Sequence, residues 1–326
     1  MWKNTWSGVS NRRLLRSCGI DPSSEARPPG PEPRAPKKVH RLRTYASFVR
    51  FSHSVFALPF ALTGALLALH QQGTWSADFI FWRLVWIVVA MVAARSAAMG
   101  FNRLVDAGYD ALNPRTASRE LPRGAMTRLE AALFVAVSVI VFVFAAYKLG
   151  PVCFALSPVA LVIVFWYSLA KRVTNYTQFF LGLAMAVAPV GGWLAAGGRG
   201  GWEPWLLALA IGTWVGGFDV LYACQDLDFD LQHGLRSIPV RFGLRRALVI
   251  SRVLHIVTIV ALAALAWVTD LGWIYLCGVG GVAALLAWEQ SMVSEHDLSQ
   301  VKRAFDLNGY VGILYLATTA VAVYLR

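Results

Sequence analysis

Long apolar runs alternate with short polar loops from about residue 53 to the end of the chain. Several runs are about 18 residues long, near the ~20 residues that a helix needs to cross the hydrocarbon of a bilayer. Apolar residues are continuous within each run, which excludes the alternating strands of a membrane β-barrel. We therefore predict an all-α integral membrane protein, a bundle of about nine transmembrane helices. The spans are expected near 53–70, 80–101, 129–147, 152–169, 179–196, 205–222, 247–268, 271–288 and 308–325.

Composition supports a membrane protein and distinguishes the N-terminal region from the transmembrane domain. The 326 residues are 57% hydrophobic and 15% charged, whereas soluble domains are about 45–50% apolar and roughly a quarter charged. Residues 1–38 are basic and proline-rich and lack apolar periodicity, which is typical of a disordered cytoplasmic tail. A targeting segment is the alternative, because the first twenty residues carry basic side chains and no acidic one. The transmembrane domain is expected at 39–326.

The net charge of +12 does not indicate a nucleic-acid partner, because the basic residues lie between apolar runs. Most of the 30 Lys and Arg residues fall in the N-terminal region and in alternate loops. By the positive-inside rule, these segments should be cytoplasmic. The four cysteines are far apart and show no C-x-x-C spacing, so neither a disulfide framework nor a zinc site is indicated.

Two acidic clusters follow two of the apolar runs. Asn102, Asp106 and Asp110 are four residues apart, so on a helix they share one face. Asp226 and Asp230 repeat this spacing after a later run. Carboxylate and amide oxygens are hard ligands that suit Mg²⁺, which commonly binds one or two carboxylates together with substrate phosphates. The two clusters therefore predict a site in which Mg²⁺ and a diphosphate are held between two helix ends, on the cytoplasmic side.

With these clusters the chain resembles the UbiA-type intramembrane aromatic prenyltransferases. The family pattern is N-x3-D-x3-D after the second helix and D-x3-D after the sixth, and the two clusters match these in turn. The segments 115–124, 167–172 and 49–60 are also similar, and the resemblance runs from about Tyr45 to the C-terminus. It implies Mg²⁺-dependent transfer of a polyprenyl group from polyprenyl diphosphate to an aromatic acid such as 4-hydroxybenzoate, in ubiquinone or menaquinone biosynthesis. The implied location is the bacterial inner membrane.

Basic and aromatic residues near the clusters are candidates for the substrates. Charge-assisted hydrogen bonds to phosphate oxygens are expected from Arg115, Arg119, Lys171 and Arg172. The family places an arginine that meets the aromatic acid near Arg50, whose alternative role is snorkelling to lipid headgroups. Aromatic faces can stabilise the allylic cation left when diphosphate departs. The candidates for this role are Tyr222, Phe101, Tyr109, Trp166, Tyr167 and Phe218.

Two charges lie deeper in the same apolar runs. Arg95 is seven residues before Asn102, and Asp219 is seven before Asp226. Seven steps of ~100° return to the same helix face, roughly 10 Å deeper. Charges inside a span usually face a cavity and have a partner. One interpretation is a structural ion pair between Arg95 and Asp219. The other is an acceptor site, in which Arg95 orients the carboxylate or phenol and Asp219 helps to take up the proton lost from the ring.

Two other functions are open at this point. The segment 49–60 resembles that of a bacterial branch of the family, which is linked to 1,4-dihydroxy-6-naphthoate in the futalosine route to menaquinone. Membership of this branch would change the acceptor but not the chemistry. A membrane transporter is the alternative from another class, because intramembrane charges also mark ion pathways. Transporters often contain inverted repeats, whereas the acidic motif recurs here in parallel sense after two runs. This favours an enzyme.

Overall fold

The computed structural model describes residues 44–45, 47–48, 57–73 and 76–325. The predicted tail and Arg50 lie outside these ranges. Within them, all regular secondary structure is helical. The helices are α2 (Leu58–Gln72), α3 (Ala77–Leu112), α4 (Arg128–Leu149), α5 (Pro151–Val173), α6 (Thr177–Ala195), α7 (Glu203–Ala223), η3 (Cys224–Asp226), α8 (Leu227–Gln232), α9 (Ile238–Phe242), α10 (Leu244–Thr269), α11 (Gly272–Ser291) and α12 (Val301–Tyr324).

Eight helices in the described part of the chain are long and apolar enough to cross a membrane. The first expected span corresponds to α2, which has 15 residues and so falls short of the ~20 residues needed. The all-α membrane bundle is therefore confirmed, whereas the count of nine spans is not.

Local sequence signals explain where several helices begin and end. Ser76 caps the start of α3 by accepting a hydrogen bond from the amide of residue 79. Thr127 and Glu130 form a capping box at the start of α4, which satisfies amide groups that the first helical turn leaves unpaired. Gly150 ends α4 with a positive φ of 129°, and Pro151 begins α5 immediately afterwards, a position that tolerates the missing proline amide hydrogen.

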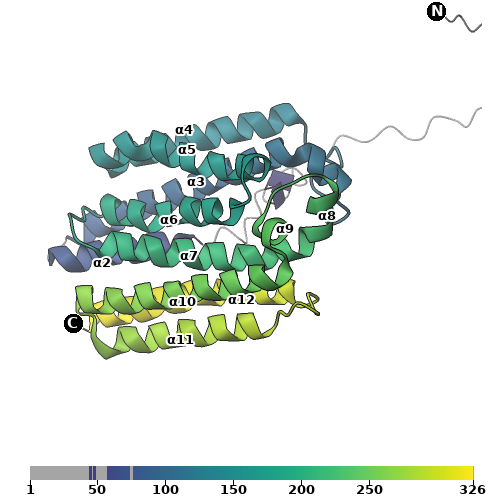
Figure 1. Cartoon of the computed structure of the whole chain (residues 1–326). Helices are drawn as coiled ribbons and strands as arrows, with labels where there is room; N and C mark the ends of the chain where they lie inside the picture. Colours follow the sequence, from purple (N-terminus) through teal and green to yellow (C-terminus); the bar gives the residue numbers. More distant parts are fainter. Residues whose placement is uncertain (1–43, 46, 49–56, 74–75, 326) are drawn as a thin grey trace, which may run out of the picture. The chain divides into compact units, whose positions relative to one another are not determined.

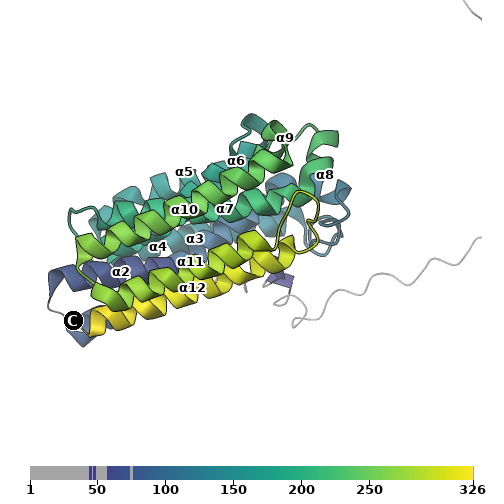
Figure 2. The ribbon, with the colours of Figure 1, turned by 60° about the horizontal axis from the view of Figure 1, so that its bottom comes forward.

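The helices lie side by side, with α8, α9 and the α3–α4 connection at one end of the bundle and the C-terminus at the other (Figures 1 and 2). Helix α7 packs against α6 and α10, α3 against α4, and α11 against α12. Helices α2 and α6 approach closely because both present glycine: a Cβ on Gly64 would lie 2.1 Å from the Pro189 carbonyl oxygen, and one on Gly192 would lie 1.9 Å from that of Ala61. Small residues at such contacts are typical of membrane helices.

A buried polar chain links three helices away from the acidic clusters. The indole Nε1 of Trp214 on α7 donates to Oδ1 of Asn308 on α12 at 2.7 Å. Nδ2 of Asn308 donates in turn to Oε1 of Glu289 on α11 at 3.1 Å. Hydrogen bonds between transmembrane helices add to van der Waals packing where lipid offers no hydrophobic driving force. These two hydrogen bonds hold α7, which carries part of the site, against the C-terminal helices α11 and α12.

Helix α3 is longer than the apolar run that predicted it. Hydropathy places a span at 80–101, but the helix continues to Leu112. Its 36 residues correspond to about 54 Å at ~1.5 Å per residue, more than the ~30 Å of hydrocarbon. The first acidic cluster thus lies on the last turns of a continuous helix, and not in a loop after it.

Candidate functional site

A polar cavity of about 200 Å³ lies among the ends of α3, α5 and α7, the α3–α4 connection and α8. Every metal-binding, phosphate-binding or catalytic residue predicted within the described ranges, except Arg95, lines it. These residues are Asn102, Asp106, Asp110, Arg115, Arg119, Lys171, Arg172, Asp219, Tyr222, Asp226 and Asp230. The two clusters, more than 100 residues apart in sequence, therefore face a common space.

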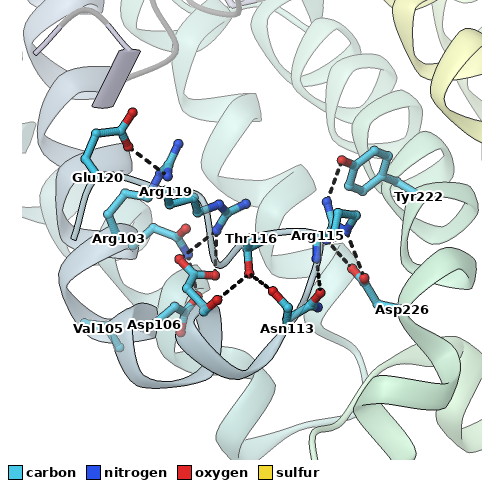
Figure 3. A network of polar contacts seen from close by, with 12 residues as sticks. Arg103, Val105, Asp106, Asn113, Arg115, Thr116, Arg119, Glu120, Tyr222 and Asp226 are labelled. Atoms are coloured by element: carbon cyan, nitrogen blue, oxygen red, sulfur yellow. Dashed lines mark hydrogen bonds and ion pairs between the residues drawn. The ribbon is translucent and has the colours of Figure 1, made fainter. Parts of the chain in front are cut away.

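Arginines and aspartates pair across this cavity (Figure 3). Arg115 binds Asp226 with two hydrogen bonds, from Nη2 at 2.6 Å and from Nε at 3.1 Å. Nη1 of Arg119 contacts both carboxylate oxygens of Asp110, at 2.7 and 2.8 Å. The pair of Arg115 with Asp226 is bidentate, a strong geometry because two nitrogens of the planar guanidinium match the two carboxylate oxygens. Burial lowers the pKa of Arg115, but the charge and hydrogen bond of Asp226, together with Tyr222 and Asp110, outweigh it, so the pKa is raised above its ordinary value.

The first cluster also interacts with the end of α5. Nη2 of Arg172 lies 3.4 Å from Oδ1 of Asp106 and donates to the carbonyl of Val105 at 2.7 Å. Nδ2 of Asn102 donates to the other oxygen of Asp106 at 3.1 Å. Three of the cluster aspartates are thus each paired with an arginine.

Asp230 differs from the other aspartates of the clusters. Its side chain is buried, and Oδ2 has no hydrogen-bond partner among the described residues. A buried polar atom without a partner is costly, and a carboxylate oxygen of this kind is suited to a cation. The structure does not bring three His, Cys, Asp or Glu side chains within the described ranges into one metal-binding group. Arginines hold the other three aspartates, so these carboxylates could bind a cation only after the ion pairs open.

The α3–α4 connection is held in place by residues that the spacing of the acidic clusters did not reveal. Oγ1 of Thr116 donates to the carbonyl of Asp110 at 3.0 Å, and Oδ1 of Asn113 accepts from the amide of Arg115 at 2.9 Å. Nη1 of Arg103 lies 3.3 Å from Oε2 of the buried Glu120 (Figure 3). These contacts fix the backbone that presents both loop arginines to the cavity.

A second set of contacts joins the segment after α8 to the α5–α6 connection. The amide of Arg236 donates to the carbonyl of Lys171 at 3.1 Å, and its Nη1 donates to the carbonyl of Val173 at 2.5 Å. The amide of Ile238 donates to Oε1 of Gln178 at 3.2 Å. This arrangement fixes the segment that follows α8, the helix of Asp230, relative to the end of α5 and the start of α6. No short-range pattern in the sequence indicates these partners.

Three of the six aromatic candidates line the cavity, namely Tyr109, Tyr167 and Tyr222. The hydroxyl of Tyr222 accepts a hydrogen bond from Arg115 at 2.8 Å. The other three have packing roles or face outwards: Phe101 contacts Phe165, Phe218 is buried against Trp214, and Trp166 is exposed.

A second, apolar cavity of about 440 Å³ lies next to the polar one and is lined mainly by α3, α5 and α6. Tyr167 and Leu181 line both cavities, so they mark the junction. Arg95 is the single charged residue among those lining the apolar cavity in the described chain, and its Nε is buried without a hydrogen-bond partner there. Asp219 lines the polar cavity instead. The ion pairs of the described residues do not include Arg95–Asp219, so the structure does not form the ion pair considered from sequence.

Comparison with known proteins relates this site to one family. A profile of the UbiA prenyltransferase family matches residues 57–316. The 4-hydroxybenzoate octaprenyltransferase of Vibrio campbellii is 31% identical over 260 residues, covering 79% of this chain and 89% of the relative. That of Cronobacter sakazakii is 30% identical over 246 residues, covering 74% and 84%.

Solved structures of UbiA homologues have the same fold. The apo structure of a homologue from Aeropyrum pernix is 33% identical, with a TM-score of 0.75 over 83% of this chain and 98% of that chain. A homologue from Archaeoglobus fulgidus, solved bound to GPP and Mg²⁺, has a TM-score of 0.65 over 86% of this chain and 99% of that chain. At 18% identity, the second likeness concerns the fold alone.

Proposed function

Because the chain belongs to the UbiA prenyltransferase family, it is a prenyltransferase, and we propose that it transfers a polyprenyl group from polyprenyl diphosphate to an aromatic acid. The proposed acceptor is 4-hydroxybenzoate or a related acid, such as 1,4-dihydroxy-6-naphthoate, of quinone biosynthesis. One observation carries this proposal: two cavities adjoin each other. The first is polar and contains paired Asp and Arg side chains, and the second is apolar. A prenyl diphosphate has the same division into a charged head and an apolar tail.

The polar cavity suits Mg²⁺ and a diphosphate together. The proposed metal ligands are Asn102, Asp106, Asp110, Asp226 and Asp230. When bound, Mg²⁺ would neutralise charge on the departing diphosphate. The unpartnered oxygen of Asp230 supports a cation here. Arg115, Arg119 and Arg172, which bind carboxylates in this structure, would exchange them for phosphate oxygens, with Lys171 as a further cation. Because opposite charges enter together, the exchange leaves few buried charges unpaired.

The acceptor is proposed to bind at the junction of the two cavities. Arg95 would bind its carboxylate or phenol oxygen, since this guanidinium lies in an apolar cavity with its Nε unpartnered. The bond between the allylic carbon and the diphosphate oxygen breaks, the aromatic ring carbon bonds to the allylic carbon, and the proton on that ring carbon passes to Asp219. Tyr222 would stabilise the developing cation with its ring face. The role of Arg50 in acceptor binding stays a prediction from the resemblance.

The test is a product analysis. Membranes containing the protein are incubated with one prenyl diphosphate, Mg²⁺ and both 4-hydroxybenzoate and 1,4-dihydroxy-6-naphthoate, and products are identified by mass. We expect one of the two acids to gain a single prenyl group. Prenylation of neither acid, with the protein correctly inserted, would contradict an aromatic acid as acceptor.

Orientation in the membrane yields a separate prediction. From the positive-inside rule we expect the polar cavity on the cytoplasmic side of the membrane, which by the resemblance should be the bacterial inner membrane. In a variant without native cysteines, Ser118→Cys and Gln232→Cys should react with an impermeant thiol reagent only from the cytoplasmic side. Arg199→Cys, in the α6–α7 connection, should react only from the other side. All three residues are exposed. Labelling of positions 118 and 232 from opposite sides would refute the arrangement.

A further inference from the structure

The N-terminus of α6 lies on the wall of the polar cavity. Thr177 and Gln178, the first two residues of this 19-residue helix, both line the cavity. The N-cap residue, Tyr176, makes no capping hydrogen bond with its side chain, and the first turn contains no acidic residue. The backbone amides of Thr177 and Gln178 have no hydrogen-bond partner among the described residues. Unpaired amides and the helix dipole make such an end favourable for negative charge.

The hydroxyl of Thr177 is a second, independent feature of this helix end. The residue is 5% exposed, and its Oγ1 has no hydrogen-bond partner in the part of the chain that the structure describes. A buried hydroxyl without a partner is destabilising, and an apolar group of the same shape would avoid that cost. An oxygen of a bound substrate would give this hydroxyl the hydrogen-bond acceptor that the protein does not supply.

Contacts of Gln178 and Leu181 define where this helix end lies. Gln178 is buried, and its Oε1 accepts a hydrogen bond from the amide of Ile238 at 3.2 Å, which fixes the start of α6 to the segment that follows α8. Leu181, one helical turn after Thr177, lines both the polar and the apolar cavity. The free donors of α6 are therefore held in place within one turn of the junction of the two cavities.

We propose that the N-terminus of α6 is an anion-binding subsite of the polar cavity. In this subsite the hydroxyl of Thr177 and the amides of Thr177 and Gln178 donate hydrogen bonds to an anionic oxygen of a substrate. These donors differ from those of the cavity arginines, which are already bound to carboxylates. The α6 donors bind an anion without first opening an ion pair.

The identity of the anionic oxygen rests on the proposed function. The diphosphate of the prenyl donor and the carboxylate of the aromatic acid both carry such an oxygen. The helix end lies between the places proposed for these two groups, because Thr177 lines the polar cavity and Leu181 marks the junction. The two sources share the same chemistry, and binding measurements with each group alone distinguish them.

The test replaces Thr177 by valine, which removes the hydroxyl and keeps the shape of the side chain and the backbone amides. Purified protein in lipid vesicles is titrated by calorimetry with inorganic diphosphate in the presence of Mg²⁺, and separately with 4-hydroxybenzoate. We expect Thr177→Val to raise the Kd of at least one probe by about tenfold or more, as for loss of a hydrogen bond to a charged group. Thr177→Ser, which keeps the hydroxyl, should bind both probes like the wild type.

Thermal unfolding without substrate separates binding from a structural role. Because the Thr177 hydroxyl has no protein partner, Thr177→Val should unfold at the wild-type temperature or slightly above it. Thr174→Val is the matched control: Oγ1 of Thr174 accepts from the amide of Tyr176 at 3.2 Å, and the residue does not line the polar cavity. This variant should keep both Kd values.

Two results would overturn the subsite. One is unchanged binding of both probes by Thr177→Val, or no binding of either probe by the wild type. The other is weaker binding that is accompanied by a lower unfolding temperature, which would show a structural role. Failure of the proposed function has a different signature: a wild type that binds inorganic diphosphate but prenylates no aromatic acid refutes the function, while the diphosphate titration of Thr177→Val still decides the subsite.

Discussion

Prenyl transfer is expected to fall about a thousandfold when Asp226 is replaced by alanine, with the protein still inserted and folded. Asp226 holds Arg115 in the structure at hand and is a proposed Mg²⁺ ligand, so its loss removes stabilisation of the leaving diphosphate. A metal ion contributes several kcal/mol to such charge stabilisation, and ~4 kcal/mol corresponds to about a thousandfold in rate. Asp106→Ala should behave in the same way, because Asp106 belongs to the facing cluster.

Asp228 provides the matched control for this prediction. It lies on α8, two residues from Asp226, but is exposed and does not line the polar cavity. Asp228→Ala should therefore keep turnover close to that of the wild type. The measurement is the initial rate of product formation as a function of Mg²⁺ concentration. Near-normal turnover of Asp106→Ala or Asp226→Ala at saturating Mg²⁺ would rule out the proposed metal site.

Arg95→Leu is expected to weaken use of the aromatic acid by about 10-fold to 100-fold while the KM for prenyl diphosphate stays unchanged. The reason is position: Arg95 lies in the apolar cavity, about 10 Å below the first cluster at ~1.5 Å per residue, and is thus remote from the diphosphate. A hydrogen bond to a charged group contributes ~1.5–3 kcal/mol, which sets this range. Arg95→Lys, which keeps the charge, should restore part of the affinity for the acid.

Asp219→Asn should lower kcat by about 100-fold or more, because a positioned base typically contributes 10²–10⁴-fold. Its dependence on Mg²⁺ should stay that of the wild type, which separates a proton acceptor from a metal ligand. If both the Arg95 and the Asp219 variants lose affinity for prenyl diphosphate and keep that for the acid, the acceptor site is assigned wrongly. If both fail to fold, the two buried charges are structural.

The spacing of residues predicted much of the site because its central feature is local. The four-residue spacing of Asn102, Asp106 and Asp110 requires only a helix, and α3 continues through all three. Hydropathy ends this helix too early because it reports where lipid contact ends, whereas polar residues can extend a helix beyond the membrane. Hydropathy also gives one span too many among the described helices. The first apolar run corresponds to α2, whose 15 residues are fewer than a span requires.

The sequence does not reveal which side chains pair when they lie far apart along the chain. Arg115 meets Asp226 across 111 positions of the chain, and Arg236 reaches the end of α5 across 63. Neither pairing has a short-range signature, because each depends on how separate helices pack. The same holds for the two adjoining cavities: Arg95 and Asp219 occupy matching places relative to their clusters, yet they line different cavities.

The central claim is that this site couples release of diphosphate to prenylation of an aromatic acid in a Mg²⁺-dependent reaction. The most direct measurement follows both products in parallel, using purified protein in lipid vesicles with prenyl diphosphate and the acid, as Mg²⁺ is added. We predict that diphosphate and prenylated acid appear in equal amounts, only with Mg²⁺, and that Asp226→Ala produces neither. Prenylated acid at the full rate without a divalent cation, or movement of substrate across the vesicle membrane with no diphosphate released, would contradict the account.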